Sequence, residues 1–344
     1  MSFDVPADAY DRFMGRFSEP LAGQFAAWLG LVPGQRVLDV GCGPGALTRV
    51  LAAVVGPGQV SAIDPSDSFV AAVRERVPGV EVRSGVAEKL PWPDGAFDCT
   101  AAQLAVHLMA DPQAGIAEMA RVTRPGGVVA ATVWDLAGGT APVSVFWRGA
   151  QEVDPAVRTE ADRPGGREGD LPARLRQAGL AEVESTVLTV SLRFSSFEEW
   201  WAPFTLGVGP PGSYLAGLTG AQREALRDAC TRLIPAVPFT LSARSWTARG
   251  RTARREAPLW ALSRLVGTSL AGSASPPWVS RPCGRPAGRR VGCRGWRPAA
   301  YWPRASSTAS RRRGISRKPG RMNPRPPAAA CISSVPSAIW PTSR

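Results

Sequence analysis

Histidine is almost absent from this sequence of 344 residues, which contains a single copy, His107. The six cysteines form no C-x-x-C pair, so no zinc-binding pattern is visible and no metal site is expected. No apolar run approaches the roughly 20 residues that would cross a bilayer. The first residues also lack the basic and apolar segments of a secretory signal. These absences predict a reduced, cytoplasmic protein without membrane contact.

Acidic residues are nearly absent from the last quarter of the chain. Residues 1–250 carry 22 Lys and Arg against 27 Asp and Glu, whereas residues 251–344 carry 19 basic residues and one acidic residue, Glu256. The formal net charge of +13 therefore comes entirely from this C-terminal part. The high charge says nothing about the partners of the first 250 residues.

The C-terminal residues 251–344 also show almost no hydrophobic periodicity, being rich in Arg, Pro, Ser, Gly and Ala with five tryptophans. Such a segment cannot bury enough apolar surface to offset its backbone entropy, so we expect a disordered basic tail. Two origins stay open. The composition favours a GC-rich reading frame translated out of register after a frameshift, and the charge would also suit a nucleic-acid-binding arm.

Strand and helix patterns alternate through the first part of the chain. A helix capped by Ser18 is expected first, then a helix after residue 45 and a third beginning at Ser66. Between and after them lie apolar runs typical of strands, at residues 36–40, 59–63, 80–82, 97–102 and 128–134. This alternation predicts an α/β fold with a doubly wound, mostly parallel sheet and helices on both faces.

The first strand runs directly into the glycine-rich segment Gly41-Cys42-Gly43-Pro44-Gly45, and the second strand ends in Asp64. In such a sheet a ligand sits beyond the carboxyl ends of the strands, where both features lie. Glycines let a ligand approach the backbone, and a carboxylate at the end of the next strand can accept both hydroxyls of a ribose. The pair predicts an adenosine-containing ligand.

Two cofactor classes fit this pattern. The segment also satisfies G-x-G-x-x-G/A, the fingerprint of dinucleotide binding, so NAD(P) and a reductase function stay as an alternative. Asp39, two positions before the first glycine, favours the other class. Its carboxylate would repel a pyrophosphate, but it would attract the ammonium and sulfonium of S-adenosyl-L-methionine.

Several further segments resemble the class I S-adenosylmethionine-dependent methyltransferases, in particular the small-molecule branch of the ubiquinone/menaquinone-biosynthesis C-methyltransferases (methyltransferase type 11). The resemblance covers residues 36–134. It rests on the first motif at residues 37–45, the acidic Asp64, and the segments at residues 85–98, 103–112 and 121–127. It implies a seven-stranded Rossmann-like methyltransferase sheet with an antiparallel last strand. The cofactor-binding residues it implies are Asp39, Gly41, Cys42, Gly43, Gly45, Asp64, Pro65, Phe69, Ala87 and Gln103.

Three residues around this motif set carry separate expectations. Arg16, in the N-terminal segment, is expected to pair with the methionine carboxylate of the cofactor, with a solvated surface arginine as the alternative. His107 is the candidate general base, although it can equally line the pocket or cap a helix. Val86 stands where the family often has an acidic residue that accepts the adenine amino group, so adenine recognition is expected to differ.

The predicted domain organisation follows from these patterns. A methyltransferase domain spans residues 1–250, with an N-terminal helical lid (1–35), a cofactor-binding core (36–135) and a substrate-side region with the last strands (136–250). Alternating apolar residues at 188–194 and the segment 239–249 supply the last strand pair. Between them, Thr219-x-x-Gln222 opens a helix, and adjacent Trp200 and Trp201 either pack in a core or form an aromatic cage.

The methyl acceptor is the open question. The leading prediction is a small, partly apolar molecule methylated on oxygen, nitrogen or carbon, because transfer from a sulfonium needs mainly alignment of the attacking atom. A nucleic-acid methyltransferase that uses the basic tail is the second possibility. Against it, residues 100–104 lack an Asn/Asp-Pro-Pro-aromatic motif and the net charge of the first 250 residues is negative. A cofactor-binding protein without catalysis is the third. The sequence gives no argument for an oligomeric state.

Overall fold

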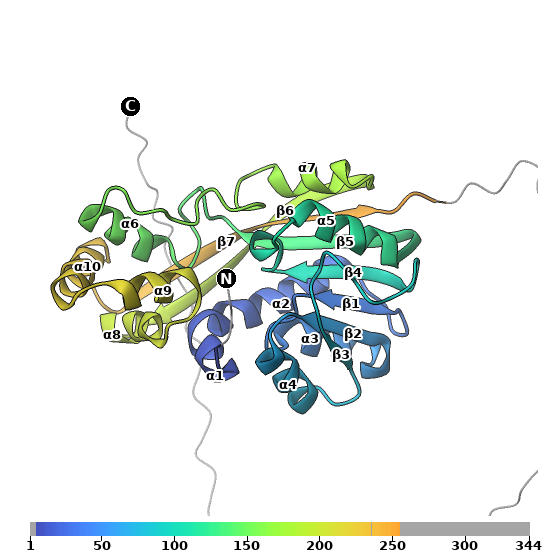
Figure 1. Ribbon diagram of the computed structural model, residues 1–344, viewed down its shortest axis with the longest axis horizontal. Coiled ribbons are helices and arrows are strands. Elements are labelled where there is room, and N and C mark those ends of the chain that lie inside the picture. Colours follow the sequence, from blue (N-terminus) through green and yellow to red (C-terminus); the bar gives the residue numbers. More distant parts are fainter. Residues whose placement is uncertain (1–4, 235, 255–344) are drawn as a thin grey trace, which may run out of the picture. The chain divides into compact units, whose positions relative to one another are not determined.

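The structure is a computed structural model that describes residues 5–234 and 236–254. The prediction for the basic tail falls outside the described residues from residue 255 onward. Seven strands of the described residues form one sheet in the order β3-β2-β1-β4-β5-β7-β6 (Figure 1). They are β1 (Val37–Val40), β2 (Val60–Asp64), β3 (Glu81–Ser84), β4 (Phe97–Gln103), β5 (Thr123–Trp134), β6 (Ala181–Phe194) and β7 (Phe239–Arg251).

The first five strands run parallel, and β7 runs antiparallel to both β5 and β6. The predicted doubly wound sheet with an antiparallel last strand is therefore confirmed. Two strands are longer than the apolar runs indicated. β6 pairs with β7 from Ala181 to Phe194, and these backbone hydrogen bonds extend it into polar sequence. The start of β5 pairs with β4 instead, through Thr123 and Phe97.

Helices cover both faces of this sheet. Those of the core are α2 (Arg16–Leu29), α3 (Ala46–Val55), α4 (Asp67–Arg76), α5 (Pro112–Val122) and α7 (Asp170–Gln177), with short 3-10 turns η2 (Pro57–Gln59) and η3 (Val106–Leu108). In Figure 1, α5 and α7 lie on one face and α2 to α4 on the other. No helix of the described residues combines the length and apolarity that crossing a membrane requires.

The alternation of side chains along each strand explains this layering. In β1, Leu38 and Val40 pack with the residues of α5 and α7, whereas Val37 packs with α2 and α3. All of these side chains are buried, so β1 is apolar on both faces, as expected for a strand in the middle of a parallel sheet. Asp39 is the exception in this strand, since a carboxylate is buried there at the end facing the glycine loop.

The N-terminal segment differs from the prediction. A helix α1 (Ala7–Tyr10) leads through a π-helical turn η1 (Asp11–Gly15) directly into α2. Ser18 is therefore an interior helical residue and not the cap, and its hydroxyl donates to the carbonyl oxygen of Gly15 at 3.4 Å. The helical backbone is already satisfied by the preceding turns, which removes the need for a capping side chain at this position.

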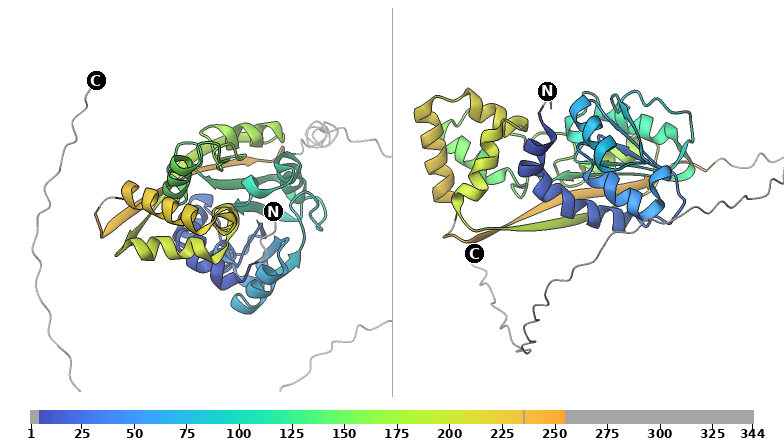
Figure 2. Two further views of the ribbon diagram at one scale, coloured as in Figure 1. Left: turned by 60° about the vertical axis from the view of Figure 1, so that its left-hand side comes forward. Right: turned by 90° about the horizontal axis from the view of Figure 1, so that it is seen from below.

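A group of helices lies at one end of the sheet. It consists of α6 (Ser144–Val153), α8 (Phe197–Trp201), η4 (Ala202–Leu206), α9 (Gly209–Gly217) and α10 (Gly220–Leu233). In the views of Figure 2, the strands β6 and β7 run from this group to the parallel strands, and the N-terminal helices lie between it and α4. The predicted capping box of Thr219 and Gln222 is present at the start of α10.

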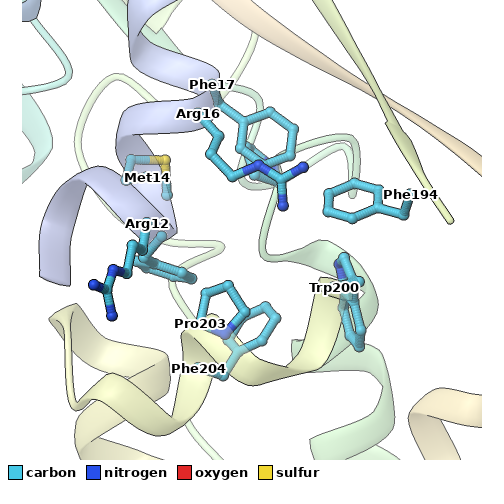
Figure 3. A pocket seen from close by; sticks show the side chains of 10 residues that line it. Arg12, Met14, Arg16, Phe17, Phe194, Trp200, Pro203 and Phe204 are labelled. Atoms are coloured by element: carbon cyan, nitrogen blue, oxygen red, sulfur yellow. The ribbon is translucent and has the colours of Figure 1, made fainter. Parts of the chain in front are cut away.

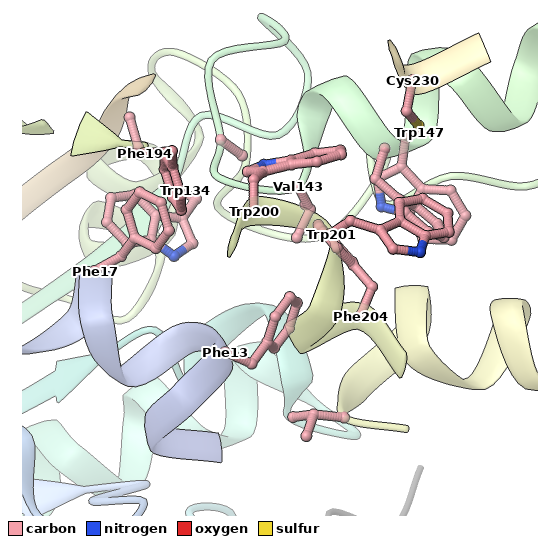
Figure 4. Packing of buried hydrophobic residues seen from close by; sticks show 14 of the residues in the cluster. Phe13, Phe17, Trp134, Val143, Trp147, Phe194, Trp200, Trp201, Phe204 and Cys230 are labelled. Carbon is pink, nitrogen blue, oxygen red and sulfur yellow. The ribbon is translucent and has the colours of Figure 1, made fainter. Parts of the chain in front are cut away.

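The tryptophan pair belongs to the hydrophobic core of this group (Figure 4). Trp200 and Trp201 expose only 3% and 7% of their surfaces, which favours core packing over an open aromatic cage. Phe146 of α6 lies at the centre, with its ring stacked on Phe204 at 4.7 Å between centroids and on Trp201 at 6.2 Å. This aromatic cluster joins α6 to α8 and η4.

Replacement of Phe146 by alanine is expected to test that role. The side chain is fully buried, so the loss of its contacts and the cavity left behind should lower the free energy of unfolding by about 3–5 kcal/mol. Chemical denaturation of the full chain measures this. Val54→Ala, at a residue with 36% of its surface exposed, is the control and should cost about 1 kcal/mol or less. Equal effects of the two changes would contradict the packing described.

Candidate functional site

A cavity of about 710 Å³ lies at the carboxyl ends of β1, β2 and β4. Its lining combines the glycine loop, the end of β2, the segment after β3 and the segment after β4, which is the position that a doubly wound sheet offers a ligand. Nine of the twelve site residues expected from the sequence line it: Asp39, Gly41, Cys42, Gly43, Asp64, Pro65, Phe69, Ala87 and Gln103. Gly45, Arg16 and His107 do not.

The glycine loop begins where β1 ends. Gly41 has a φ of +70°, and a Cβ there would lie 2.4 Å from the Cβ of Ala105 in the segment after β4. Gly43 has a φ of +52°, and no atom lies within 4 Å of where its Cβ would be. The loop therefore packs tightly on one side at Gly41 and leaves open space at Gly43, on the cavity. Gly45, with a φ of +100°, is the N-cap residue of α3.

Asp64 connects this loop to the next helix. One carboxylate oxygen accepts a hydrogen bond from the backbone N–H of Gly43 at 2.8 Å, and the other accepts from the N–H of Ser66 at 2.9 Å. Ser66 in turn caps α4, with its hydroxyl accepting from the N–H of Phe69, as the sequence predicts. Burial raises the pKa of Asp64, while the hydrogen bonds from Ser66 and Gly43 oppose this shift.

Asp39 lies below the loop and is fully buried. Its Oδ2 accepts a hydrogen bond from the Thr48 hydroxyl at 2.6 Å, and its Oδ1 has no hydrogen-bond partner in the structure. Burial raises the pKa of Asp39 to about 7, with the negative charge of Asp64 adding to the shift. A positively charged ligand group would relieve both the missing hydrogen bond and the cost of ionising this carboxyl group.

The opposite wall of the cavity is more apolar. Pro65 and Phe69 come from the end of β2 and from α4, and Ala87 comes from the segment after β3. Val86 lines the cavity with 47% of its surface exposed. The neighbouring Glu88 also lines the cavity, and one oxygen of its carboxylate accepts a hydrogen bond from the backbone N–H of Asp111 at 3.1 Å. This wall is suited to a flat ring system.

Two cavity residues, Tyr10 of α1 and Ser18 of α2, come from the N-terminal helices. The ring of Tyr10 packs edge-on against Phe69, with 5.4 Å between ring centroids. Burial and the nearby Asp64 carboxylate raise the pKa of Tyr10, so its phenol stays neutral and can donate a hydrogen bond. Gln103 donates to the carbonyl oxygen of Ser18 at 3.0 Å, and its own Oε1 is buried without a partner. The sequence predicts that the N-terminal segment containing Tyr10 forms a lid, but no motif singles out Tyr10 itself.

Arg16 lies away from this cavity (Figure 3). Its guanidinium donates to Glu199 of α8 at 2.7 Å and lies 4.7 Å from the centroid of the Phe194 ring. It lines a separate small pocket of about 20 Å³ together with residues of the aromatic cluster such as Phe17, Trp200 and Phe204. Arg16 pairs with Glu199 and does not line the large cavity, so the structure does not place it where the expected ion pair with a cofactor carboxylate would form.

His107 also lies outside the cavity lining. Its imidazole is buried and its Nδ1 has no hydrogen-bond partner in the structure. Burial and the neighbouring charge of Arg163 lower the pKa of His107 to about 3, so the ring is neutral at pH 7 and a poor proton acceptor. His107 lies within the η3 turn, so it neither lines the cavity nor caps a helix, the two alternatives to a general base that the sequence suggests.

The comparisons with known proteins agree with this geometry. Residues 38–131 match the family model of a methyltransferase domain. This segment is therefore similar to a methyltransferase domain. The chain is 35% identical over 131 residues to the ubiquinone/menaquinone biosynthesis C-methyltransferase of Ectopseudomonas mendocina. The matched segment covers 36% of this chain and 48% of that enzyme.

Other similar proteins include an uncharacterized 37.1 kDa protein in transposon TN4556 of Streptomyces fradiae. It is 42% identical over 109 residues, or 30% of this chain and 32% of that protein. The chain thus spans from about a third to about half the length of these two curated relatives. Among solved structures, YcgJ of Bacillus subtilis is similar at 19% identity, with a TM-score of 0.45, over 69% of this chain and 99% of that one.

The two glycines of the loop give a direct test of its packing. Gly43→Ala is expected to cost only the strain of a left-handed alanine, about 1–2 kcal/mol of unfolding free energy. Gly41→Ala adds the clash with Ala105, so it should cost about 1–3 kcal/mol more. Urea denaturation of both variants measures the difference, and a larger loss for Gly43→Ala would contradict the loop geometry.

Proposed function

We propose that the protein binds S-adenosyl-L-methionine in the large cavity and transfers its methyl group to a small, partly apolar acceptor, on oxygen, nitrogen or carbon. One observation supports this most strongly. Two buried carboxylates, Asp39 and Asp64, flank a glycine loop whose backbone is open to the cavity at Gly43. A ligand with a ribose and a cationic end matches both carboxylates, whereas the Asp39 carboxylate would repel the pyrophosphate of NAD(P).

The lining residues fit this cofactor group by group. Asp64 is suited to ribose hydroxyls, since a carboxylate accepts two hydrogen bonds at once. The unpartnered Oδ1 of Asp39 and the unpartnered Oε1 of Gln103 are acceptors for an ammonium. Pro65, Phe69 and Ala87 supply apolar contacts for an adenine. When bound, S-adenosylmethionine supplies a methyl group that is already activated by its sulfonium.

The residues of this chain then have a modest chemical task. Leu104, Ala105, Leu108 and Met109 give the cavity an apolar wall after β4, which suits a partly apolar acceptor and excludes water. Aligning such an acceptor with the reactive carbon supplies most of the rate acceleration. His107 follows Val106 in the turn after β4, next to this wall in sequence, but its pKa of about 3 makes it a weak base, so the proposal depends on alignment. The buried thiols of Cys42, Cys99 and Cys230 agree with a reducing, cytoplasmic setting.

Calorimetric titration of the full chain with S-adenosylmethionine, S-adenosylhomocysteine and NADPH tests the cofactor. Binding of the first two is expected, and Asp64→Asn should weaken both at least tenfold because hydrogen bonds to a charged acceptor contribute about 1.5–3 kcal/mol each. Asp94→Asn, at an exposed carboxylate paired with Arg121, is the control and should change neither affinity. Binding of NADPH alone would overturn the proposal.

The pKa of Asp39 gives a pH-dependent test. Its pKa of about 7 lies above the ordinary value, so the folded protein without ligand holds this carboxyl group protonated below pH 7. A ligand ammonium favours the ionised form. Binding must therefore release a proton at low pH, and affinity should rise as the pH increases toward 7.

Between pH 5.5 and 7.5 the affinity for S-adenosylhomocysteine is expected to increase on the order of tenfold. Asp39→Asn removes the titrating group, so this variant should bind more weakly at pH 7.5 and show little change over the same range. Titrations at four pH values measure both proteins. A flat profile for the wild-type chain would show that Asp39 does not face the cationic end of the ligand.

A further inference from the structure

The charges around the cavity are unevenly distributed. Four carboxylates line it, those of Asp39, Asp64, Asp67 and Glu88, whereas Arg163 is the one cationic side chain among the described residues of its lining. The expected cation, Arg16, pairs with Glu199 in the other pocket. A negative group that enters the cavity would therefore meet Arg163 as the cation of the described lining, although Arg163 also interacts with the Glu160 carboxylate. Anions otherwise face a carboxylate-rich wall, which disfavours them.

Arg163 is held in place by the loop that connects α6 to α7. The backbone N–H of Arg163 donates to the carbonyl oxygen of Glu160 at 3.0 Å, and its carbonyl oxygen accepts from Gly166 at 3.1 Å. Gly166 also accepts a hydrogen bond from Ala137, just after β5, at 3.1 Å. The loop is thereby connected to the segment that follows β5, so the side chain projects from a supported backbone.

The guanidinium reaches the segment after β4. Its Nη1 donates to the carbonyl oxygen of His107 at 3.4 Å. That segment supplies Leu108 and Met109 to the apolar wall assigned to the acceptor. Because the imidazole of His107 is neutral, the positive charge at this place belongs to Arg163. Guanidinium presents five N–H donors in a planar fork, which suits two-point binding of a carboxylate.

We propose that Arg163 is the anion-binding residue of the cavity and receives a carboxylate there. The inference rests on the proposed function, which supplies two sources of this group. One is an acidic methyl acceptor, whose apolar part would lie against Leu108 and Met109. The other is the carboxylate of the methionine moiety of the cofactor. Both use the same chemistry, and binding experiments separate them.

Arg163→Gln removes the charge but keeps a polar side chain, and Arg163→Lys keeps the charge but not the fork. Arg167→Gln is the matched control, because this arginine lies on the same loop, is exposed, and pairs with Asp162 outside the cavity lining. Each full-length variant is titrated with S-adenosylmethionine, S-adenosylhomocysteine and 5′-methylthioadenosine, which lacks the amino-acid carboxylate. The complexes with S-adenosylhomocysteine are then titrated with salicylate and indole-3-acetate and with the corresponding amides.

If the cofactor is the source, Arg163→Gln weakens the binding of S-adenosylmethionine and S-adenosylhomocysteine at least tenfold and leaves the affinity for 5′-methylthioadenosine unchanged. If the acceptor is the source, cofactor affinities are unchanged, the wild-type complex binds an acid more tightly than its amide, and Arg163→Gln removes this preference. In either case Arg163→Lys should cause a smaller loss than Arg163→Gln, and Arg167→Gln should cause no loss.

Unchanged cofactor affinities together with no preference for the acids in the wild-type complex would overturn the assignment of Arg163. An equal loss of affinity for S-adenosylmethionine, S-adenosylhomocysteine and 5′-methylthioadenosine would also overturn it. Such a pattern would indicate a disturbed cavity and not a lost carboxylate contact. A wild-type chain that binds no S-adenosylhomocysteine contradicts the proposed function itself, so the two failures are distinguishable.

Discussion

The carboxylate of Asp64 is the interaction on which the site depends. It accepts hydrogen bonds from the backbone of Gly43 and of Ser66, and so joins the glycine loop after β1 to the first turn of α4. Without it the loop would keep the backbone hydrogen bonds from Gly41 and Cys42 to Ile63 of β2, but the N–H groups of Gly43 and Ser66 would lack this acceptor. Asp64 also lines the cavity, so one residue shapes the site and is placed to bind the proposed ligand. This double use explains why a carboxylate is needed here.

Much of this arrangement could be predicted from the sequence, because it depends on local chemistry. The glycine run indicates a loop, in which Gly41 and Gly43 adopt the left-handed backbone that glycine permits, and the short apolar strand before them indicates where the loop begins. Ser66 caps α4 through a contact three residues away, which spacing reveals directly. The strand alternation then leads to a doubly wound sheet, whose topology puts the ends of β1, β2 and β4 together.

The parts that could not be predicted depend on contacts between distant segments. Arg16 lies only two positions before Ser18, which lines the cavity, yet it pairs with Glu199, which lies 183 positions later. His107 follows β4, a position that suggested a general base, but its ring is buried in the η3 turn and does not line the cavity. Tyr10 and Arg163 line the cavity from segments without any recognisable motif. A charged or aromatic side chain in a loop gives no periodic signal, so only the folded chain shows which surface it meets.

The central claim is that Asp64 binds the ribose of an adenosine-containing cofactor, and a crystal structure of the full chain with S-adenosylhomocysteine tests it most directly. The account predicts both ribose hydroxyls within hydrogen-bonding distance of the Asp64 carboxylate, with the amino group of the ligand near the unpartnered Oδ1 of Asp39. A ligand bound elsewhere would contradict the account. So would a ligand in this cavity whose ribose makes no contact with Asp64.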